Sequence, residues 1–299
     1  MITLKAPAKI NWSLYVLDRR GDGYHNILSF MQCIALYDTL VFEPADGIEL
    51  LSNMTIPQEE NLVFRTAALL KKHADTTLGA KITLRKEIPS GAGLGGGSSD
   101  AAFALIGLNK IWGLGLGNHE LKQLAAYIGS DVPFFLDGPA AIVQGRGDVL
   151  QPVDSLQADS MLIVKPDISV STASAYAMVA ESREDSDIID SLTNNGEKLN
   201  NIKLIIRALG EGRPELLRSS LHNDFEMVVF RRHPVIREIK DRMLDAGAAA
   251  ALMSGSGSAV FGLFEDNKRA LEAAKLFPSF WNRVAETLQT GNDGAVFTH

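Results

Sequence analysis

Hydrophobic and polar residues alternate along the first segment of the chain. Four apolar side chains between Ile10 and Val16 alternate with polar ones that begin with Lys9 and Asn11. Successive side chains of a strand point to opposite faces, so this period of two predicts a strand with one buried and one polar face. Lys9 and Asn11 then lie side by side on the face opposite Trp12.

Strand and helix patterns follow one another through the rest of the first half. After a turn in RRGDG, a second strand is predicted around 29–36. Alternation at 80–85 predicts a strand that ends at Pro89. The remaining patterns predict helices at 61–73, about 98–112 and about 118–128, and a hairpin at 141–153 that turns at Gly145 to Gly147.

The second half is a separate region with its own strands and helices. A polar stretch near 152–160 marks a candidate boundary, which divides the chain into domains 1–155 and 156–299. The patterns after it predict a strand at 161–164, mostly helical segments that include the polar stretch 182–201, strands at 249–253 and 259–264 joined by SGSGS, a helix, and a terminal strand at 294–299. The expected fold class is α+β in two lobes, without internal repeats.

Composition and charge exclude several classes of protein. The chain has 299 residues, of which 46% are hydrophobic, and this is enough for a large core. A net charge of −7 disfavours nucleic-acid binding and means that an anionic substrate needs local positive groups. No apolar run is long enough to span a membrane, and no leader segment is expected before the first strand. The single cysteine, Cys33, fits a reducing compartment such as the cytoplasm and favours a buried structural thiol over a catalytic one.

The stretch PSGAGLGGGSSDAA, residues 89–102, combines glycines with the expected start of a helix. Five of the seven positions from Gly91 to Gly97 are glycine. Glycines let backbone N–H groups approach a phosphate closely, and the helix N-terminus adds unpaired donors and a partial positive charge. Ser98 or Ser99 can cap the helix or reach a metal ion or a phosphate oxygen. The alternative is a flexible loop before an ordinary cap.

Two common phosphate-binding motifs fit this stretch poorly. A GxGxxG pattern begins at Gly91, but the dinucleotide fingerprint needs an acidic residue at the end of the next strand, and Glu120 lies at a helix start. The P-loop motif fails because Gly97 stands at the lysine position. A phosphate loop without its own lysine needs a cation from elsewhere, and Lys9 is one candidate.

The glycine stretch resembles the nucleotide loop of the GHMP kinases, the family of galactokinase, homoserine kinase, mevalonate kinase and phosphomevalonate kinase. The loop alone supports only this family. APAKINWSL, RRGDGYH and GSDVPFF, in this order, are similar to segments of the branch that phosphorylates 4-diphosphocytidyl-2-C-methylerythritol in the non-mevalonate isoprenoid pathway. SGSGSAVFGLF at 254–264 extends the resemblance into the second lobe.

The resemblance implies a two-lobed GHMP-kinase fold, with a ribosomal-S5-like ATP-binding domain at 1–155 and a ferredoxin-like α+β substrate domain at 156–299. It implies phosphorylation of the 2-hydroxyl of that small-molecule substrate, with ATP as co-substrate and Mg²⁺ to neutralise phosphate charge. The resemblance places the ATP phosphates on Pro89, Ser90, Gly91, Ala92, Gly93, Leu94, Gly95, Gly96, Gly97, Ser98 and Ser99.

The resemblance also assigns the reacting groups. Asp131 would be the base toward the acceptor hydroxyl, and Lys9 would be its partner and stabilise the transferring phosphoryl group or the developing alkoxide. A carboxylate beside an ammonium stays ionised at neutral pH. From the residues alone, the favoured alternatives are a helix cap for Asp131, because SDVP is typical of a helix start, and a solvated strand position for Lys9.

Four further residues are expected at the acceptor. The resemblance makes Tyr24 a stacking partner of the cytosine base and His25 a hydrogen-bonding partner, whereas a lone Tyr-His pair is otherwise ordinary surface or core. Asn11, which shares a face with Lys9, can hydrogen-bond a substrate hydroxyl or be a polar outward position. Tyr176 is the expected second stacking ring from the other lobe. The SGSGS turn can close on a substrate or be only a tight hairpin.

Three other functions remain to be weighed. A related kinase acting on homoserine or mevalonate would have no base for Tyr24 and His25 to bind. A catalytically silent nucleotide-binding module would not need both Lys9 and Asp131. A dehydrogenase is the weakest alternative, because the acidic residue of the dinucleotide motif is missing.

Overall fold

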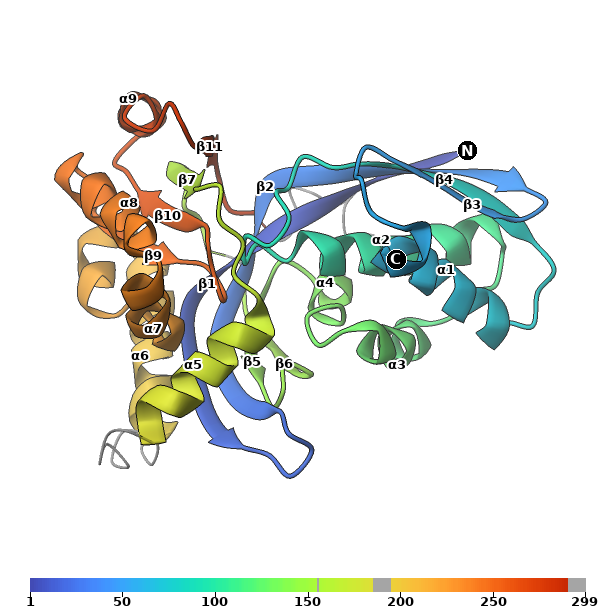
Figure 1. Cartoon of the computed structure of the whole chain (residues 1–299), viewed down its shortest axis with the longest axis horizontal. Helices are drawn as coiled ribbons and strands as arrows, with labels where there is room; N and C mark the ends of the chain where they lie inside the picture. Colours follow the sequence, from blue (N-terminus) through green and yellow to red (C-terminus); the bar gives the residue numbers. More distant parts are fainter. Residues whose placement is uncertain (155, 185–194, 290–299) are drawn as a thin grey trace.

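The computed structural model describes residues 1–154, 156–184 and 195–289, which form two β-sheets with helices packed against them (Figure 1). The first sheet has the order β3-β4-β2-β1-β8, and β5 pairs with both β2 and β6. Its strands are β1 (Ile2–Arg19), β2 (His25–Ala45), β3 (Ile48–Ser52), β4 (Gly79–Arg85), β5 (Ala140–Gln144), β6 (Val149–Pro152) and β8 (His222–Asn223).

The second sheet is built from the later part of the chain and has the order β11-β7-β10-β9, with antiparallel pairs throughout. Its strands are β7 (Met161–Lys165), β9 (Ala250–Met253), β10 (Val260–Leu263) and β11 (Trp281–Ala285). Helices and strands are thus mixed in both lobes, which confirms the predicted α+β class. The terminal strand expected at 294–299 lies outside the described residues.

The helices separate into two groups (Figure 1). Those of the first lobe are α1 (Leu62–His73), α2 (Gly96–Ile111), α3 (Asn118–Ile128) and α4 (Phe134–Asp137). Those of the second lobe are α5 (Thr172–Glu184), α6 (Asn195–Gly210), α7 (Asp224–Arg232), α8 (Pro234–Asp245) and α9 (Asn267–Ala274). In the described part of the chain, no helix is long and apolar enough to cross a membrane.

The long hairpin of β1 and β2 connects the two lobes (Figure 1). Its strands have 18 and 21 residues, and the pairing runs from Ile2 opposite Phe42 to Arg19 opposite His25. At about 3.3 Å per residue, β1 spans roughly 60 Å, which is long enough to belong to both lobes. This hairpin is longer than the alternation predicted.

The prediction of a half-buried first strand is wrong. Every residue from Ala6 to Val16 is buried, so this part of β1 has no solvated face. Trp12 on one side packs edge-on against Phe261 of the second lobe, with ring centroids 5.5 Å apart. The other side, which carries Lys9, faces the cleft described below. Alternation distinguishes the two faces of a strand but does not show what covers each one.

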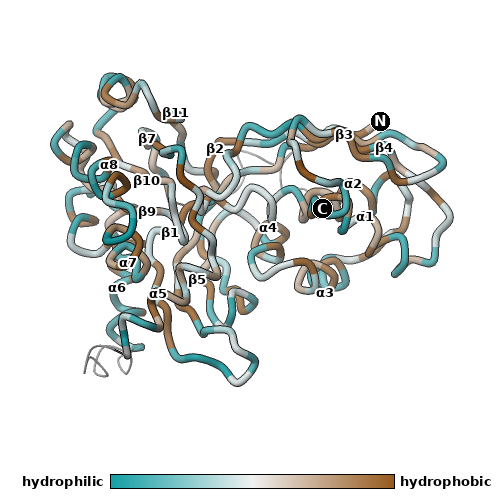
Figure 2. The backbone as a smooth tube through the Cα atoms, viewed as in Figure 1, coloured by the Kyte–Doolittle hydropathy of each residue, from teal (hydrophilic) through white to brown (hydrophobic). Residues whose placement is uncertain are grey.

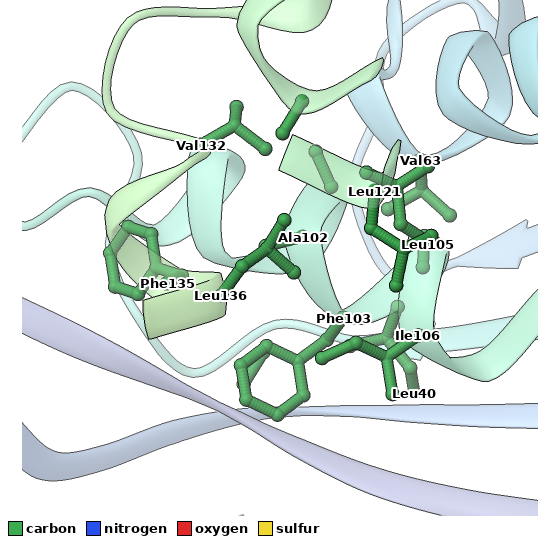
Figure 3. Packing of buried hydrophobic residues seen from close by; sticks show 14 of the residues in the cluster. Leu40, Val63, Ala102, Phe103, Leu105, Ile106, Leu121, Val132, Phe135 and Leu136 are labelled. Atoms are coloured by element: carbon green, nitrogen blue, oxygen red, sulfur yellow. The ribbon is translucent and has the colours of Figure 1, made fainter. Parts of the chain in front are cut away.

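Each lobe has an apolar core, and a third cluster joins them. In the first lobe, Figure 3 shows Phe103 and Ile106 of α2 beside Leu40 of β2, where all three side chains are buried. The joining cluster contains Trp12 and Phe261. Whereas the cores are apolar, Figure 2 shows hydrophilic positions along the outer surfaces of several helices. The β1–β2 hairpin is therefore fixed by both lobes.

Candidate active site

The glycine stretch forms a tight loop between the segment after β4 and the start of α2. Gly91, Gly93 and Gly95 all have positive φ, at 61°, 75° and 71°. A Cβ on Gly93 would lie 2.0 Å from the Ser254 carbonyl oxygen, and one on Gly95 would lie 2.9 Å from the Lys9 side chain. Glycine is required here because the neighbouring chain segments come so close.

The helix after the loop begins earlier than predicted, and the serines do not cap it. Gly95 is the N-cap residue of α2, and no side chain accepts a capping hydrogen bond there. Of the roles considered for Ser98 and Ser99, the helix cap is therefore excluded, because Gly95 in the left-handed region is the N-cap residue. The first turn of α2 keeps backbone N–H donors without a side-chain partner, as an anion site needs.

Lys9 and Asp131 approach each other although they are far apart in the sequence. Lys9 Nζ lies 3.8 Å from Asp131 Oδ2, and it donates hydrogen bonds to Asn11 Oδ1 at 2.6 Å and to the Gly93 carbonyl oxygen at 3.0 Å. Burial lowers the pKa of Lys9, and the Asp131 carboxylate opposes that shift. The pair places a proton acceptor beside a cation directly under the glycine loop.

Both simpler interpretations of these two residues are wrong. The Lys9 side chain is only 4% exposed, so it is not a solvated strand position. Asp131 does not cap a helix, because α4 begins at Phe134 with Pro133 as its N-cap residue and without a capping side chain. The Asp131 side chain is instead 37% exposed and open to the cleft.

A cleft of about 400 Å³ contains the glycine loop and the Lys9–Asp131 pair. Its further lining comes from β1, β2, the segments around α1, Lys86, Asp100 and the second lobe, where Gly255 to Gly257 lie on one side. Every residue from Pro89 to Ser98 lines it, whereas Ser99 is buried and does not. Ser98 thus faces the space where phosphates would lie, and Ser99 points elsewhere.

A second cavity of about 630 Å³ adjoins the cleft. Tyr24, His25 and Tyr176 line it, together with Arg146 from the β5–β6 turn. Asp131 lines both spaces. A phosphoryl donor bound in the cleft and a phosphoryl acceptor bound in the second cavity would therefore meet at this carboxylate.

The aromatic residues of the second cavity come from both lobes. The rings of His25 and Tyr176 stack with centroids 5.2 Å apart and planes 10° from parallel. Tyr24 is 55% exposed, with the Arg146 guanidinium 5.8 Å from its ring centroid. Burial lowers the pKa of His25, so the imidazole is neutral at pH 7. Burial raises the pKa of the Tyr176 phenol to about 12.

The SGSGS turn is a hairpin and also a contact between the lobes. It connects the antiparallel strands β9 and β10. Ser254 Oγ donates to the Gly93 carbonyl oxygen at 3.0 Å, and Ala259 N donates to the Ala92 carbonyl oxygen at 3.1 Å. Through these two hydrogen bonds, the second lobe holds the glycine loop in place next to Lys9 and Asp131.

Several polar residues at the site were not anticipated from the sequence. Lys86 lines the cleft and pairs with Asp38 and Asp100, and Arg146 lines the second cavity. The basic residues follow short strands, where a lysine or an arginine is ordinary, so no local signal marks them. Among the described residues, no group of three or more His, Cys, Asp or Glu side chains could hold a metal ion.

Cys33 has the properties of a structural residue. It is fully buried in the first-lobe core, and burial raises the pKa of its thiol well above its usual range. A thiol that stays protonated is a weak nucleophile. The favoured interpretation of Cys33 as a buried structural thiol is confirmed.

Comparison with known proteins agrees with this geometry. The chain matches the GHMP kinases N terminal domain over residues 61–139 and the GHMP kinases C terminal domain over residues 205–283. It is 44% identical to a 4-diphosphocytidyl-2-C-methyl-D-erythritol kinase of Thermodesulfovibrio yellowstonii, with 96% of this chain and 98% of the relative covered. It is 41% identical to the protein of that name from Alkaliphilus metalliredigens, with 91% of each chain covered.

Solved structures give the same result. A crystal structure of a 4-(cytidine 5'-diphospho)-2C-methyl-D-erythritol kinase matches with a TM-score of 0.79 and 33% identity, covering 96% of this chain and 99% of that one. Homoserine kinase from Cytophaga hutchinsonii shares the fold, with a TM-score of 0.70, 19% identity, and 96% and 94% of the two chains covered. The chain is therefore an ATP-dependent small-molecule kinase of the GHMP family, and within that family it belongs to the 4-diphosphocytidyl-2-C-methyl-D-erythritol kinases.

Proposed function

We propose that the protein transfers the γ-phosphoryl group of ATP to the 2-hydroxyl of 4-diphosphocytidyl-2-C-methyl-D-erythritol, giving the 2-phosphate and ADP. The observation that carries this proposal is the place of Asp131. Its carboxylate lines both the glycine-loop cleft and the aromatic cavity, and Lys9 Nζ lies 3.8 Å away. A donor and an acceptor bound on the two sides would react at this pair.

The proposed chemistry uses few protein groups. The acceptor oxygen forms a bond to the γ-phosphorus while the bond to the bridging oxygen of ADP breaks, and Asp131 takes the hydroxyl proton. Lys9, held by Asn11 and the Gly93 carbonyl oxygen, supplies positive charge to the transferring group. The ATP phosphates lie against the backbone N–H groups of 89–98 and the N-terminus of α2.

The other end of the cleft is suited to the purine. Met54, Ile56 and Leu62 line it, and a Cβ on Gly97 would lie 3.5 Å from Leu62 Cδ1. An apolar wall next to the phosphate loop fits a flat base whose phosphates extend toward Lys9. We therefore place the adenine of ATP against these three side chains.

The cytidine end of the acceptor is assigned to the aromatic cavity. Tyr24 offers an exposed ring on which a base can stack, and the neutral His25 can hydrogen-bond it. Tyr176 contributes a second ring, from α5. Asn11 donates through its amide nitrogen to Ser29 Oγ at 2.8 Å, so one amide hydrogen remains for a substrate hydroxyl near Asp131.

The residues present fit a magnesium ion held mostly by the nucleotide. Ser98 lines the phosphate cleft and would hold the ion together with phosphate oxygens and water. The ion would neutralise charge on the phosphates when bound. Ser99, which does not line the cleft, is not assigned to it.

The wider assignments follow from the same proposal. Residues 1–155 would be the ATP-binding domain and residues 156–299 the substrate domain. The protein would act in the cytoplasm on small molecules rather than on nucleic acid or membranes, because the chain is acidic and has a single buried cysteine.

The test is ADP release with ATP, magnesium and 4-diphosphocytidyl-2-C-methyl-D-erythritol, beside homoserine and mevalonate as acceptors. We expect turnover with the cytidyl substrate alone. We also expect a loss of 10²-fold or more in Asp131→Asn, on the order of what a general base contributes. Asp137→Asn is the matched control, because Asp137 pairs with Lys122 and does not line either space.

Each contrary outcome has a distinct meaning. Turnover with homoserine or mevalonate alone would keep the kinase assignment and overturn the roles of Tyr24 and His25. Nucleotide binding without turnover of any acceptor would make the protein a silent nucleotide-binding module. Equal activity in Asp131→Asn and Asp137→Asn would remove Asp131 from the mechanism.

A further inference from the structure

A buried cluster of charged groups lies beside the glycine loop. Asp38 of β2 is 0% exposed and Asp100 of α2 is 3% exposed. The ammonium of Lys86, just after β4, contacts both: it donates to Asp100 Oδ2 at 2.6 Å and forms an ion pair with Asp38 Oδ2. Lys86 and Asp100 also line the cleft.

The second oxygen of Asp38 binds backbone. Asp38 Oδ1 accepts hydrogen bonds from Glu87 N at 2.6 Å and from Ile88 N at 2.9 Å. One carboxylate therefore holds three donors from consecutive residues, and these residues come immediately before Pro89, where the glycine loop begins. Bonds from an ionised carboxylate to backbone N–H groups are among the stronger ones in proteins.

Asp100 lies beyond the other end of the loop. It belongs to the first turns of α2, which begins at Gly96. Lys86 therefore connects the segment that enters the loop to the helix that leaves it. A Cβ on Gly96 would lie 3.1 Å from Lys86 Nζ, so the ammonium sits close under the loop itself.

The cluster is a costly way to fill a core. It buries two carboxylates with one ammonium, and Asp100 Oδ1 has no hydrogen-bond partner among the described residues. Replacing buried ion clusters by apolar residues is often neutral or stabilising, so stability alone does not account for such an arrangement. The hydrogen bonds and ion pairs of the cluster are directional, so they can hold the segment before the glycine loop at a fixed position relative to α2.

The surroundings of Lys86 also distinguish it from Lys9. The ammonium of Lys86 forms ion pairs with two carboxyl groups, whereas the ammonium of Lys9 has one carboxylate nearby, at 3.8 Å. Burial raises the pKa of Asp100 to about 7, but Asp38 and Asp100 together still offset more of the ammonium charge than the single carboxylate near Lys9 does. Lys86 is therefore better suited to connecting protein segments than to neutralising ATP.

We propose that Asp38 and Asp100, acting through Lys86, are positioning residues for the glycine loop. They fix the distance between its two ends, and so the direction of the backbone N–H groups that receive the nucleotide. This inference rests on the proposed binding of ATP phosphates to the loop. It concerns the affinity of the protein for ATP. Binding of the phosphoryl acceptor is left to other residues.

The experiment measures direct binding of ATP by calorimetry, beside steady-state kinetics, for Asp38→Asn, Asp100→Ala and Asp100→Asn. We expect the Kd for ATP to rise about tenfold or more in Asp38→Asn and Asp100→Ala, a fold-change that corresponds to about 1.4 kcal/mol. The KM for the acceptor should change by less than about twofold in the same variants. Asp100→Asn keeps an oxygen for Lys86 and should restore most of the ATP affinity lost in Asp100→Ala.

Asn109→Ala is the matched control. Asn109, near the other end of α2, holds the loop that follows the helix through hydrogen bonds at 3.0 Å to the backbone N and O of Leu116. We expect this variant to lower the unfolding temperature without changing the Kd for ATP. The control thus separates loss of stability from loss of loop position.

The outcomes separate this inference from the proposed function. If the wild-type protein fails to bind ATP, both fall. If it binds ATP and the folded Asp38 and Asp100 variants bind equally well, only the positioning role is overturned. If Asp38→Asn does not fold, the comparison of Asp100→Ala with Asp100→Asn decides: equal affinities overturn the role and unequal ones support it.

Discussion

At the scale of single residues, the surroundings of Lys9 change what it can do. Its ammonium is nearly free of solvent and is oriented by Asn11 and the Gly93 carbonyl oxygen. Burial lowers the pKa of Lys9, and Asp131 counteracts this. The result is a charge with fixed direction at the place where phosphoryl transfer would develop negative charge.

Substitution of Lys9 is expected to affect the chemical step more than nucleotide binding. Lys9→Met should lower kcat by about 10²- to 10³-fold, on the order of the loss when one preorganised electrostatic group is removed, with a smaller change in the KM for ATP. Lys5→Met is the control, because Lys5 is on the same strand but exposed and does not line the cleft. A proportional rise in KM with unchanged kcat would contradict the proposed role.

His25 carries a pH dependence of stability. Burial lowers its pKa, and the cations Arg183 and Arg19 add to the shift. Well above pH 6.5 the imidazole is neutral in both states and contributes nothing. As the pH falls below 6.5, the unfolded chain binds a proton that the folded protein resists until its lowered pKa is reached, so the folded state loses stability.

Denaturant unfolding at pH 8.5, 7.5, 6.5 and 5.5 measures this effect. We expect the wild-type protein to lose free energy of unfolding relative to His25→Gln as the pH falls from 7.5 to 5.5, and the difference between the two proteins to be nearly constant from 8.5 to 7.5. A difference that is flat over the whole range would show that the environment of His25 does not shift its pKa.

At the scale of elements, the glycine loop is where sequence and packing meet most closely. The strand before the loop and the helix after it follow from hydrophobic pattern, and both predictions are confirmed within a few residues. The glycines themselves are explained by contacts from outside the element, because Gly93 touches Ser254 and Gly95 touches Lys9. The first contact is with the other lobe, 161 residues away.

Gly93→Ala tests that packing. Its Cβ would lie 2.0 Å from the Ser254 carbonyl oxygen at a φ of 75°, so the loop or the second lobe has to move. We expect a loss of stability of about 2 kcal/mol or more and a weaker affinity for ATP, measured by thermal unfolding and calorimetry.

Gly113→Ala is the matched control for backbone strain. Gly113 has a φ of 63° but no atom within 4 Å of a Cβ, so it carries the strain without the clash. We expect it to cost about 1 kcal/mol and to leave ATP affinity unchanged. Equal effects of the two substitutions would mean that close approach to the second lobe is unimportant.

At the scale of the whole molecule, the lobes share a core as well as an active site. The β1–β2 hairpin belongs to both, and Trp12 packs against Phe261 from the second sheet. The indole N–H of Trp12 is also satisfied, because it donates to Gln32 Oε1 at 2.9 Å. If the Trp12–Phe261 contact were lost, apolar surface of both lobes would be exposed.

Trp12→Ala is therefore expected to destabilise the protein as a unit. The loss should be about 3–5 kcal/mol, as for other fully buried large side chains, and unfolding should remain a single transition by tryptophan fluorescence and circular dichroism. Trp281→Ala, in the partly buried edge strand β11, should cost clearly less. Two separated transitions in the wild-type protein would contradict the shared core.

Much of the fold was predictable from periodicity, but the covering of each face was not. The helix at 61–73 and the β5–β6 hairpin follow their patterns closely, because local burial on one side dictates them. The same reasoning predicted a solvated face for residues 9–16 of β1, which the structure does not have. The period of a strand records the contrast between its two faces, and a polar face can be solvated or can line a cleft.

The candidate site divides in the same way. The glycine loop was evident because its residues are contiguous and their chemistry is local. Lys9 and Asp131 were identified through the resemblance to GHMP kinases, since their residues alone favoured a solvated lysine and a helix cap. Lys86, Asp38 and Asp100 carried no sequence signal at all, because they come from three separate elements and only the folded chain brings them together.

The sequence by itself determined the α+β class, most of the elements, the glycine stretch at 91–97 before a helix and, through its motifs, the family. Only the tertiary structure decided that Lys9 lies 3.8 Å from Asp131, that the two cavities meet at this carboxylate, and that a buried ion cluster joins the ends of the glycine loop. The physical reason is range. Hydrophobic period and glycine content act over a few residues, whereas desolvation and ion pairing depend on which distant segments the fold packs together.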